Sequence, residues 1–431
     1  MNITNAIPSL QTPISASVSP YHCIIEASRQ LDQAGFHRLN LTGDWKLKPE
    51  QGYYLPVFDS SLMAFTVGPN LTDMPSLRME AAHTDWPCLK LKPSPEVTTD
   101  RYGKLNVEVY GGPILNTWLD RPLSMAGKVC ARGSDPFAPQ VHFIDMKRPL
   151  LVIPNLAIHM NREVNDGVKL NPQVDMLPLL TLITEALDKD HYFLNLMAEE
   201  IGCQPEDILD YEIYIYNLDG FTATGIQGEF ISSPRLDNLT SVQACLTGIT
   251  AGFRDNGINV IALYDNEEIG SRTKQGALSV VTERILEKLF AALGYDRGTY
   301  LDAVMNGFLV SMDVAHAMHP NHKEKCDIKN QISMGDGVAI KMAASQSYST
   351  DASCISVIEG LCRSHQIPYK KFSNRSDMRG GSTLGALSST LLAMKTVDVG
   401  VPMLSMHSAR EMMGTADQAA LVALASKFFL I

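Results

Sequence analysis

The sequence lacks the cysteine pairs, the long apolar runs and the basic excess that mark several classes of protein. Its eight cysteines are scattered and none forms a CxxC pair, which indicates reduced thiols rather than a disulfide framework. No run of about 18 apolar residues occurs, so we expect no membrane span. The formal net charge of −11 argues against nucleic acid and anionic membranes as partners.

The first twenty residues also lack an apolar secretory core, because they are polar with scattered proline and serine. We therefore expect a cytoplasmic protein. What is present is an ordinary globular composition, with 45% hydrophobic and 19% charged residues. A chain of 431 residues is long enough for two or three domains and a large core.

Most of the chain alternates between buried strands and amphipathic helices, which predicts an α/β fold with a mixed β-sheet and helices on both faces. The first helix is the most fully specified, with Ser19 as N-cap, Pro20 in the first turn and Gly35 as the stop. The predicted strands are 79–82, 258–264, 308–312, 338–342, 368–372 and 397–404, and the later helices are 239–253, 278–293, 351–365, 384–394 and 415–429.

The pattern changes between residues 92 and 232, where short alternating segments are separated by glycine and proline turns. The strands predicted there are 105–110, 128–130, 150–153 and 211–216, and an apolar stretch at 177–186 is predicted to be helical. We therefore expect residues 1–91 and 233–431 to form one α/β domain. Residues 92–232 would be an inserted β-rich domain, acting as a lid or in dimerisation.

Histidines and carboxylates stand just past several predicted strands, at the edge of the sheet where open α/β folds place their ligands. They are His83, Asp237, Glu267 with Glu268, Asp313 and His407. Adjacent carboxylates at the end of a buried strand are costly unless a positive charge lies beside them. Taken singly, four of them have an ordinary alternative: a turn histidine for His83, an N-cap for Asp237 and a solvated acidic loop for Glu267 and Glu268.

Taken together, two histidines and three carboxylates suit a two-metal hydrolase in which one carboxylate bridges the metals. The set favours Zn²⁺, with Mn²⁺ or Co²⁺ as substitutes because it is rich in oxygen. Asp237 is the candidate bridge. Asp85 lies two residues after His83, where it can accept a hydrogen bond from the other ring nitrogen of a metal-bound imidazole.

These motifs resemble the aspartyl aminopeptidase family, a vacuolar-type group of dinuclear zinc exopeptidases. The likeness extends from the helix at Ser19-Pro20 to Asp417. It rests on residues 83–85, 233–238, 265–270, 311–316 and 406–411, and on 154–167, which is similar to that family's inserted domain.

The resemblance implies that two zinc ions per subunit are held by His83, Asp237, Glu268, Asp313 and His407. Glu267 would then be the general base and Asp85 would orient His83. His159 would reach into a neighbouring subunit's site within a homododecameric shell.

The substrate side of the site is less well specified. Lys341 and Arg410 are candidates to meet a substrate carboxylate, with surface salt bridges as the alternative, and His316 is a further substrate-side candidate. Asn116 stands where the family pattern leads us to expect a histidine. That departure leaves open the family's preference for an acidic N-terminal residue.

The function expected is removal of the N-terminal residue from peptides with a free amine. A related dinuclear deacylase, carboxypeptidase or dipeptidase is one alternative. A catalytically silent, shell-forming scaffold is a second. A nucleotide-binding protein that uses residues 379–383 is a third, although the lysine of a phosphate-binding loop is missing there.

Overall fold

The structure, a computed structural model, describes all residues except 1–2, 186, 188–189 and 379, and the chain forms two compact units. The first unit comprises Met1–Asp85, Phe221–Met406 and Glu411–Ile431, and the second comprises Trp86–Gly220 and His407–Arg410. The second unit thus begins ahead of residue 92, ends ahead of residue 232, and includes a short segment that is distant in the sequence. The assignment of catalytic and inserted roles to the two units stays a prediction.

A nine-stranded mixed sheet forms the centre of the first unit, with its strands in the order β1-β2-β3-β13-β4-β14-β18-β16-β17. Neighbouring β13, β4, β14 and β18 are mutually parallel, whereas β2, β3 and β16 introduce antiparallel pairs. The bounds are β1 His37–Arg38, β2 Gln51–Val57, β3 Ser61–Val67, β4 Ser76–His83, β13 Gly257–Tyr264, β14 Phe308–Met312, β16 Val338–Met342, β17 Tyr369–Ser373 and β18 Lys395–Gly400.

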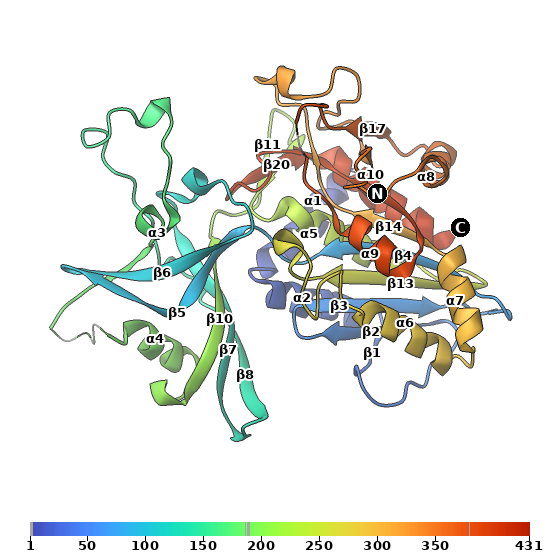
Figure 1. Ribbon diagram of the computed structural model, residues 1–431, viewed down its shortest axis with the longest axis horizontal. Coiled ribbons are helices and arrows are strands. Elements are labelled where there is room, and N and C mark those ends of the chain that lie inside the picture. The colour runs from blue at the N-terminus through green and yellow to red at the C-terminus, as the bar shows by residue number, and fades with distance from the viewer. Residues whose placement is uncertain (1–2, 186, 188–189, 379) are drawn as a thin grey trace. The chain divides into compact units, whose positions relative to one another are not determined.

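Helices cover both faces of this sheet, as the predicted fold class requires (Figure 1). Alternation along β4 decides which layer each residue meets. Met79 and Ala81 join the apolar cluster that includes α6 and α7, while Glu80 between them lies against Gly248 of α5. The helices are α1 Ile3–Ala16, α2 Pro20–Gln33, α5 Leu236–Ile249, α6 Val281–Ala292, α7 Arg297–Asn306, α8 Ala352–Ser364, α9 Leu384–Leu392 and α10 Thr415–Leu430.

The first predicted helix is confirmed in detail. The Ser19 side chain caps α2 by accepting from the main-chain N of His22, and Gly35 adopts φ +81° just beyond the helix end. The strands predicted at 308–312 and 338–342 are also confirmed, as β14 and β16.

One strand prediction in this unit is wrong. Residues 397–404 do not form a single strand, because the chain leaves β18 at Gly400 and enters a second sheet at Pro402. A Cβ at Gly400 would lie 1.3 Å from the main-chain oxygen of Asp313, so glycine permits this close approach. The second sheet has the order β11-β12-β20-β19-β15, with bounds β11 Thr222–Thr224, β12 Phe230–Ser233, β15 Ala315–His316, β19 Pro402–Leu404 and β20 Glu411–Gly414.

The second unit is built on a six-stranded antiparallel sheet in the order β8-β7-β10-β5-β6-β9. Two predictions are wrong here. Within the stretch 177–186 that was predicted to be helical, Leu179–Leu182 forms β9, because a short apolar run fits either element and here pairs with β6. The strand predicted at 150–153 is also wrong, because Leu151 and Val152 make only isolated bridges. The bounds are β5 Cys88–Thr99, β6 Tyr102–Tyr110, β7 Leu123–Asp135, β8 Ala138–Asp145, β9 Leu179–Leu182 and β10 Ile208–Asn217, with α3 Pro172–Asp175 and α4 Tyr192–Ile201.

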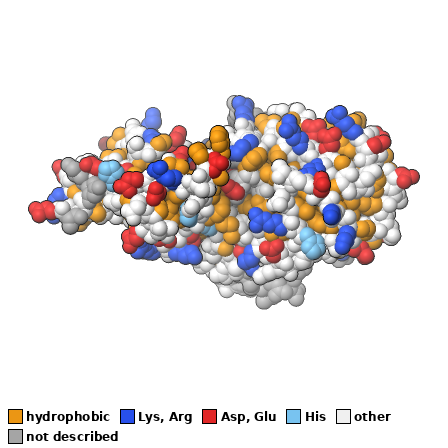
Figure 2. Space-filling view, turned by 90° about the horizontal axis from the view of Figure 1, so that it is seen from below, with side chains coloured by type: hydrophobic (Ala, Val, Ile, Leu, Met, Phe, Trp, Pro, Cys, Tyr) orange, Lys and Arg blue, Asp and Glu red, His pale blue; other side chains and the backbone are white. Residues whose placement is uncertain are grey.

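Charges of both signs are interspersed on the face shown in Figure 2, with no large area of one sign. All eight cysteines are free thiols. Among the described residues, no helix combines the length and the apolar character needed to cross a membrane.

Candidate metal centre

Three neighbouring parallel strands of the nine-stranded sheet end at one edge and present the predicted site. His83 is the last residue of β4 and pairs in register with Tyr264, the last residue of β13. Glu267 and Glu268 follow β13 in a short 3-10 helix, and Asp313 follows β14 directly. The parallel arrangement explains why residues far apart in the sequence meet here.

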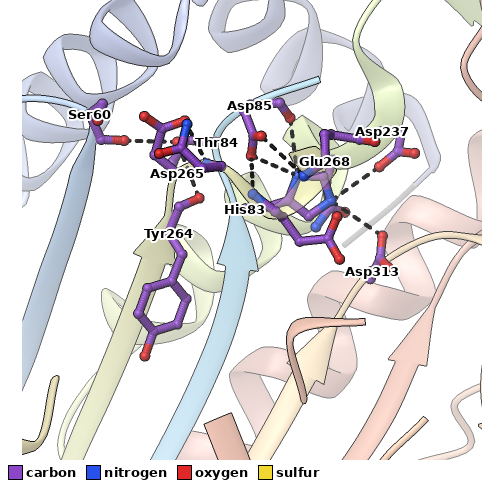
Figure 3. A network of polar contacts seen from close by, with 12 residues as sticks. Ser60, His83, Thr84, Asp85, Asp237, Tyr264, Asp265, Glu268 and Asp313 are labelled. Atoms are coloured by element: carbon purple, nitrogen blue, oxygen red, sulfur yellow. Dashed lines mark hydrogen bonds and ion pairs between the residues drawn. The ribbon is translucent and has the colours of Figure 1, made fainter. Parts of the chain in front are cut away.

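The His83 ring lies between carboxylates on both sides (Figure 3). Its Nε2 is 3.4 Å from Asp237 Oδ1 and 3.5 Å from Asp313 Oδ1. Burial lowers the pKa of His83, but the carboxylates of Asp237, Asp313 and Asp85 outweigh it and raise that pKa well above its ordinary value. The surroundings of Nε2 therefore favour a positive charge at this point.

Asp85 holds the two glutamates through their main chain. Its carboxylate oxygens accept from the main-chain N of Glu267 at 3.1 Å and of Glu268 at 3.2 Å. His83 Nδ1 is 3.0 Å from the main-chain oxygen of Asp85 and 3.5 Å from its carboxylate. The short motif 83–85 therefore fixes both the imidazole and the acidic pair that follows β13.

Both glutamates are held in a setting that disfavours their negative charge. Burial raises the pKa of Glu267 to about 8; the nearby His83 opposes this shift, and the carboxylates of Asp313, Asp85 and Asp237 add to it. Burial, followed by the charge of Asp237, raises the pKa of Glu268 well above its ordinary range. A divalent cation at this position would remove the conflict, because it favours the ionised carboxylates.

The donor set fits a metal ion. His83, Asp237 and Asp313 offer donor atoms that all lie within 4.8 Å of one another, and His83 forms a second such group with Glu267 and Glu268. Buried imidazole and carboxylate donors at this spacing suit Zn²⁺.

Asp237 is brought to the site by neighbours whose role the sequence did not reveal. Its main-chain N donates to Glu411 Oε2 at 2.9 Å, and Glu411 begins β20, which pairs with β12 at Ser233. Asn238 Nδ2 donates to the main-chain oxygen of Met312, the residue before Asp313. Glu411 and Asn238 belong to the motifs on which the family resemblance rests, and that resemblance was the only signal in the sequence for their role.

Lys341 lies in the interior and contacts a predicted ligand. Its Nζ is 3.4 Å from Asp313 Oδ2 and 5.0 Å from the centre of the Tyr348 ring. Burial lowers the pKa of Lys341, but the charge of Asp313 outweighs it. Burial raises the pKa of Asp313, yet Lys341 and His83 lower it below the ordinary value. The two groups form a buried ion pair.

The remaining predicted residues are His316, His159, Arg410 and His407. His316 is exposed at the end of β15 in the first unit. In the second unit, His159 is exposed in a turn, Arg410 Nη1 donates to the main-chain oxygen of Gly220, and His407 Nδ1 is 3.1 Å from the main-chain oxygen of Gly112. The loop with His407 follows Met406 and precedes Glu411, both of the first unit.

The start of α9 does not favour a nucleotide site. Thr383 Oγ1 donates to Asp398 Oδ1, so a buried carboxylate lies beside the start of this helix, and its charge would repel a phosphate there. Arg379, which the same alternative invoked, is outside the described residues.

Residues 14–429 match the family model described as aminopeptidase I zinc metalloprotease (M18). The chain belongs to the M18 family of zinc aminopeptidases. The resemblance to this family is confirmed, and so is the expected activity, a zinc-dependent aminopeptidase that hydrolyses peptide bonds. The related dinuclear hydrolases and the silent scaffold are not favoured.

Relatives of this M18 aminopeptidase match it over nearly their full length. A probable M18 family aminopeptidase 2 of Clostridium acetobutylicum is 44% identical over 93% of each chain. One from Pseudomonas fluorescens is 36% identical over 96% of each chain.

Solved structures agree with the fold. The cryo-EM structure of the Ape4 and Nbr1 complex matches with a TM-score of 0.94 and 33% identity, covering 99% of this chain and 86% of that one. An M18 aminopeptidase from Thermotoga maritima matches with a TM-score of 0.89 over 99% of this chain and 96% of that one; its 21% identity supports the fold alone. The mixed α/β fold class is confirmed.

Proposed function

We propose that this aminopeptidase holds two zinc ions per subunit, with His83, Asp237, Glu268, Asp313 and His407 as ligands and Asp237 as the bridge. The observation that carries the proposal is the position of His83 Nε2, between carboxylates that come from separate segments of the chain. Glu268 also offers a donor atom within 4.8 Å of one on His83, which supports its place among the ligands. Mn²⁺ and Co²⁺ are the substitutes that the same oxygen-rich set would accept.

When bound, such a metal pair would polarise the scissile carbonyl and provide a nucleophilic hydroxide. Glu267 acts as the general base, taking a proton from the attacking water and returning it to the leaving amine. Its carboxylate can do this because Asp85 fixes the main chain of Glu267 and Glu268. Burial raises the pKa of Glu267 to about 8, and a bound divalent cation would lower it again.

The substrate is a peptide with a free N-terminal amine. We propose that Arg410 and His316 lie on the substrate side. Lys341 contacts Asp313 in the interior, so we assign it an indirect role through that carboxylate. The preference for an acidic N-terminal residue rests on family likeness, and Asn116 is the departure that a substrate panel must test.

We also propose self-association as a homododecamer, in which His159 completes a neighbouring subunit's site. The exposed position of His159 supports this, because such a side chain is available to a partner. The S. cerevisiae mApe1 dodecamer has the same fold, with a TM-score of 0.85 at 23% identity, over all of this chain and 97% of that one. We propose a cytoplasmic location, supported by eight free cysteines.

Elemental analysis combined with aminoacyl substrates tests the metal proposal. We expect two zinc ions per chain, hydrolysis of free-amine substrates and no hydrolysis of their N-acetylated forms. The variant His83→Ala should lose metal and activity, whereas His322→Ala, at an exposed histidine, should retain both. One zinc per chain with full activity would contradict the two-metal proposal. Aspartyl, glutamyl and leucyl substrates in the same panel report the preferred residue.

The proposed role of His159 has its own test. Preparations of His159→Ala and Glu267→Gln should each be nearly inactive, but their co-expression should restore part of the activity. Recovery is expected because a mixed assembly pairs an intact His159 with an intact Glu267. Absence of recovery in a mixed assembly of confirmed mass would count against a role in the neighbouring site.

A further inference from the structure

A cavity of about 550 Å³ lies in the first unit at the edge of the sheet where β4 and β14 begin. Its lining includes Arg78, Arg254, Phe308, Leu361 and Phe428. The candidate metal centre lies at the other ends of these strands. Arg78 and His83 are five residues apart on β4, which corresponds to roughly 16 Å along the strand. The cavity is therefore separate from the catalytic site.

Two guanidinium groups line this cavity and retain unused donors. Arg254 is 7% exposed and donates to Asn259 Oδ1, to the Ser76 side chain and main chain, and to the main-chain oxygen of Ile258. Among the described residues, Arg78 donates from Nη1 alone, to the main-chain oxygen of Phe428 and to an oxygen of Ile431, the last residue of the sequence. Because a guanidinium has five N–H donors, Nε and Nη2 of Arg78 remain available to a ligand.

The positive charge here is not balanced by acidic side chains. Among the described residues no aspartate or glutamate lines the cavity, and Ile431, the last residue of the sequence, brings at most a single carboxylate to two arginines. Burial, followed by the charge of Arg78, lowers the pKa of Arg254 to about 9. An uncompensated charge of this kind is costly, so an anion that enters the cavity would be stabilised.

The rest of the wall is apolar. The Arg78 guanidinium carbon lies 5.5 Å from the centre of the Phe428 ring, which is itself 5.9 Å from the Phe308 ring. Val357 and Leu361 of α8 complete this side of the cavity. The wall would suit a ligand that carries its charge at one end and an apolar body at the other.

We propose that this cavity binds a monocarboxylate with a branched or aromatic body and no adjacent amine. The planar carboxylate matches the fork of donors on Arg78, and the apolar body covers the two phenylalanines. A free amino acid is a poorer fit, because the described lining offers no acidic side chain to its ammonium group and the Ile431 end already accepts from Arg78. Phosphate is also a poorer fit, because it has no apolar part.

The test is direct binding of 4-methylpentanoate to the zinc-loaded enzyme, measured by isothermal titration calorimetry. We expect one site per chain. The matched neutral amide should bind about tenfold more weakly or worse, because it loses the charge-assisted hydrogen bonds. Leucine and inorganic phosphate should also bind more weakly. Equal or tighter binding of the amide, leucine or phosphate would overturn the proposed ligand class.

A pair of surface variants locates the site. Val357→Glu introduces a negative charge at an exposed position of the lining and should weaken binding of 4-methylpentanoate at least about tenfold. Ser356→Glu introduces the same charge at the preceding exposed residue, outside the lining, and should leave binding unchanged. If the two variants bind equally well, the carboxylate is at another site, such as the metal centre, and the inference fails. Since binding is measured without turnover, this result does not depend on the peptidase mechanism.

Discussion

Lys341 Nζ lies 3.4 Å from Asp313 Oδ2, with the two side chains 2% and 13% exposed. The other oxygen of the same carboxylate, Oδ1, is 3.5 Å from His83 Nε2. Asp313 thus has a lysine on one side and the candidate metal centre on the other. Lys341 keeps Asp313 ionised and oriented, which is a positioning role.

The substitution Lys341→Met should destabilise the metal-free protein more than the zinc-loaded protein. Removing one partner of a buried pair leaves an uncompensated charge, at a cost of about 3–5 kcal/mol, whereas bound zinc would supply part of the missing positive charge. Thermal unfolding of both forms measures the difference. Lys371→Met, which breaks a partly exposed pair with Glu359, should cost much less. Equal losses in the two forms would argue against a link between Lys341 and the metal centre.

The substitution Glu267→Gln should lower kcat by a factor of about 10² to 10⁴, the usual contribution of a general base. The amide retains the shape of the side chain but cannot accept the proton. Zinc content should stay the same, because Glu267 is proposed as the base and not as a ligand. Steady-state kinetics and elemental analysis check the two parts, with Glu324→Gln at an exposed site as control. Turnover close to that of the parent enzyme would exclude Glu267 as the base.

Removal of zinc with a chelator should lower the melting temperature, and added zinc should restore it. Without the metal, burial and then the neighbouring carboxylates disfavour the negative charges of Glu267 and Glu268, and this raises the pKa of both groups. Differential scanning calorimetry before and after chelation measures the effect. In His83→Ala the chelator should change the melting temperature little. A parent protein insensitive to the chelator would show that the acidic cluster is stable without a cation.

Glu80 is fully buried on β4, and in the described part of the chain neither of its carboxyl oxygens has a hydrogen-bond partner. Burial raises its pKa well above the ordinary value of 4.5. Above pH 4.5 the Glu80 carboxyl group ionises in the unfolded chain, which lowers the free energy of that state, while in the folded chain it stays protonated. Glu80 therefore costs stability increasingly as the pH rises from 4.5 towards its folded pKa.

Glu80→Leu should accordingly stabilise the protein at pH 7, by about 1–3 kcal/mol, the penalty of an unsatisfied buried polar group. The gain should shrink as the pH is lowered towards 4. Melting temperatures of parent and variant across this range test the prediction, with Glu199→Leu on the exposed face of α4 as control. A variant that is less stable than the parent at pH 7 would show that Glu80 has a stabilising partner.

Local patterns specified many elements correctly. The strands β14 and β16 coincide with their predicted ranges, and Ser19 caps α2, because apolar runs and capping residues act over a few neighbouring residues. The errors occur where pairing with a strand distant in the sequence decides the secondary structure. Leu179–Leu182 becomes a strand because β6 is available to it, and Pro402–Leu404 joins a second sheet because β15 and β20 pair with it.

The sequence by itself determined the residue types of the candidate site and their placement after strands, because each motif is contiguous. It could not assign partners within the site. Only the tertiary structure decided that Asp85 holds the main chain of both glutamates, that Glu411 holds Asp237, and that Lys341 pairs with Asp313. These contacts join segments far apart in the chain. The order of the parallel strands in the sheet brings the segments together, and no single segment of the sequence specifies that order.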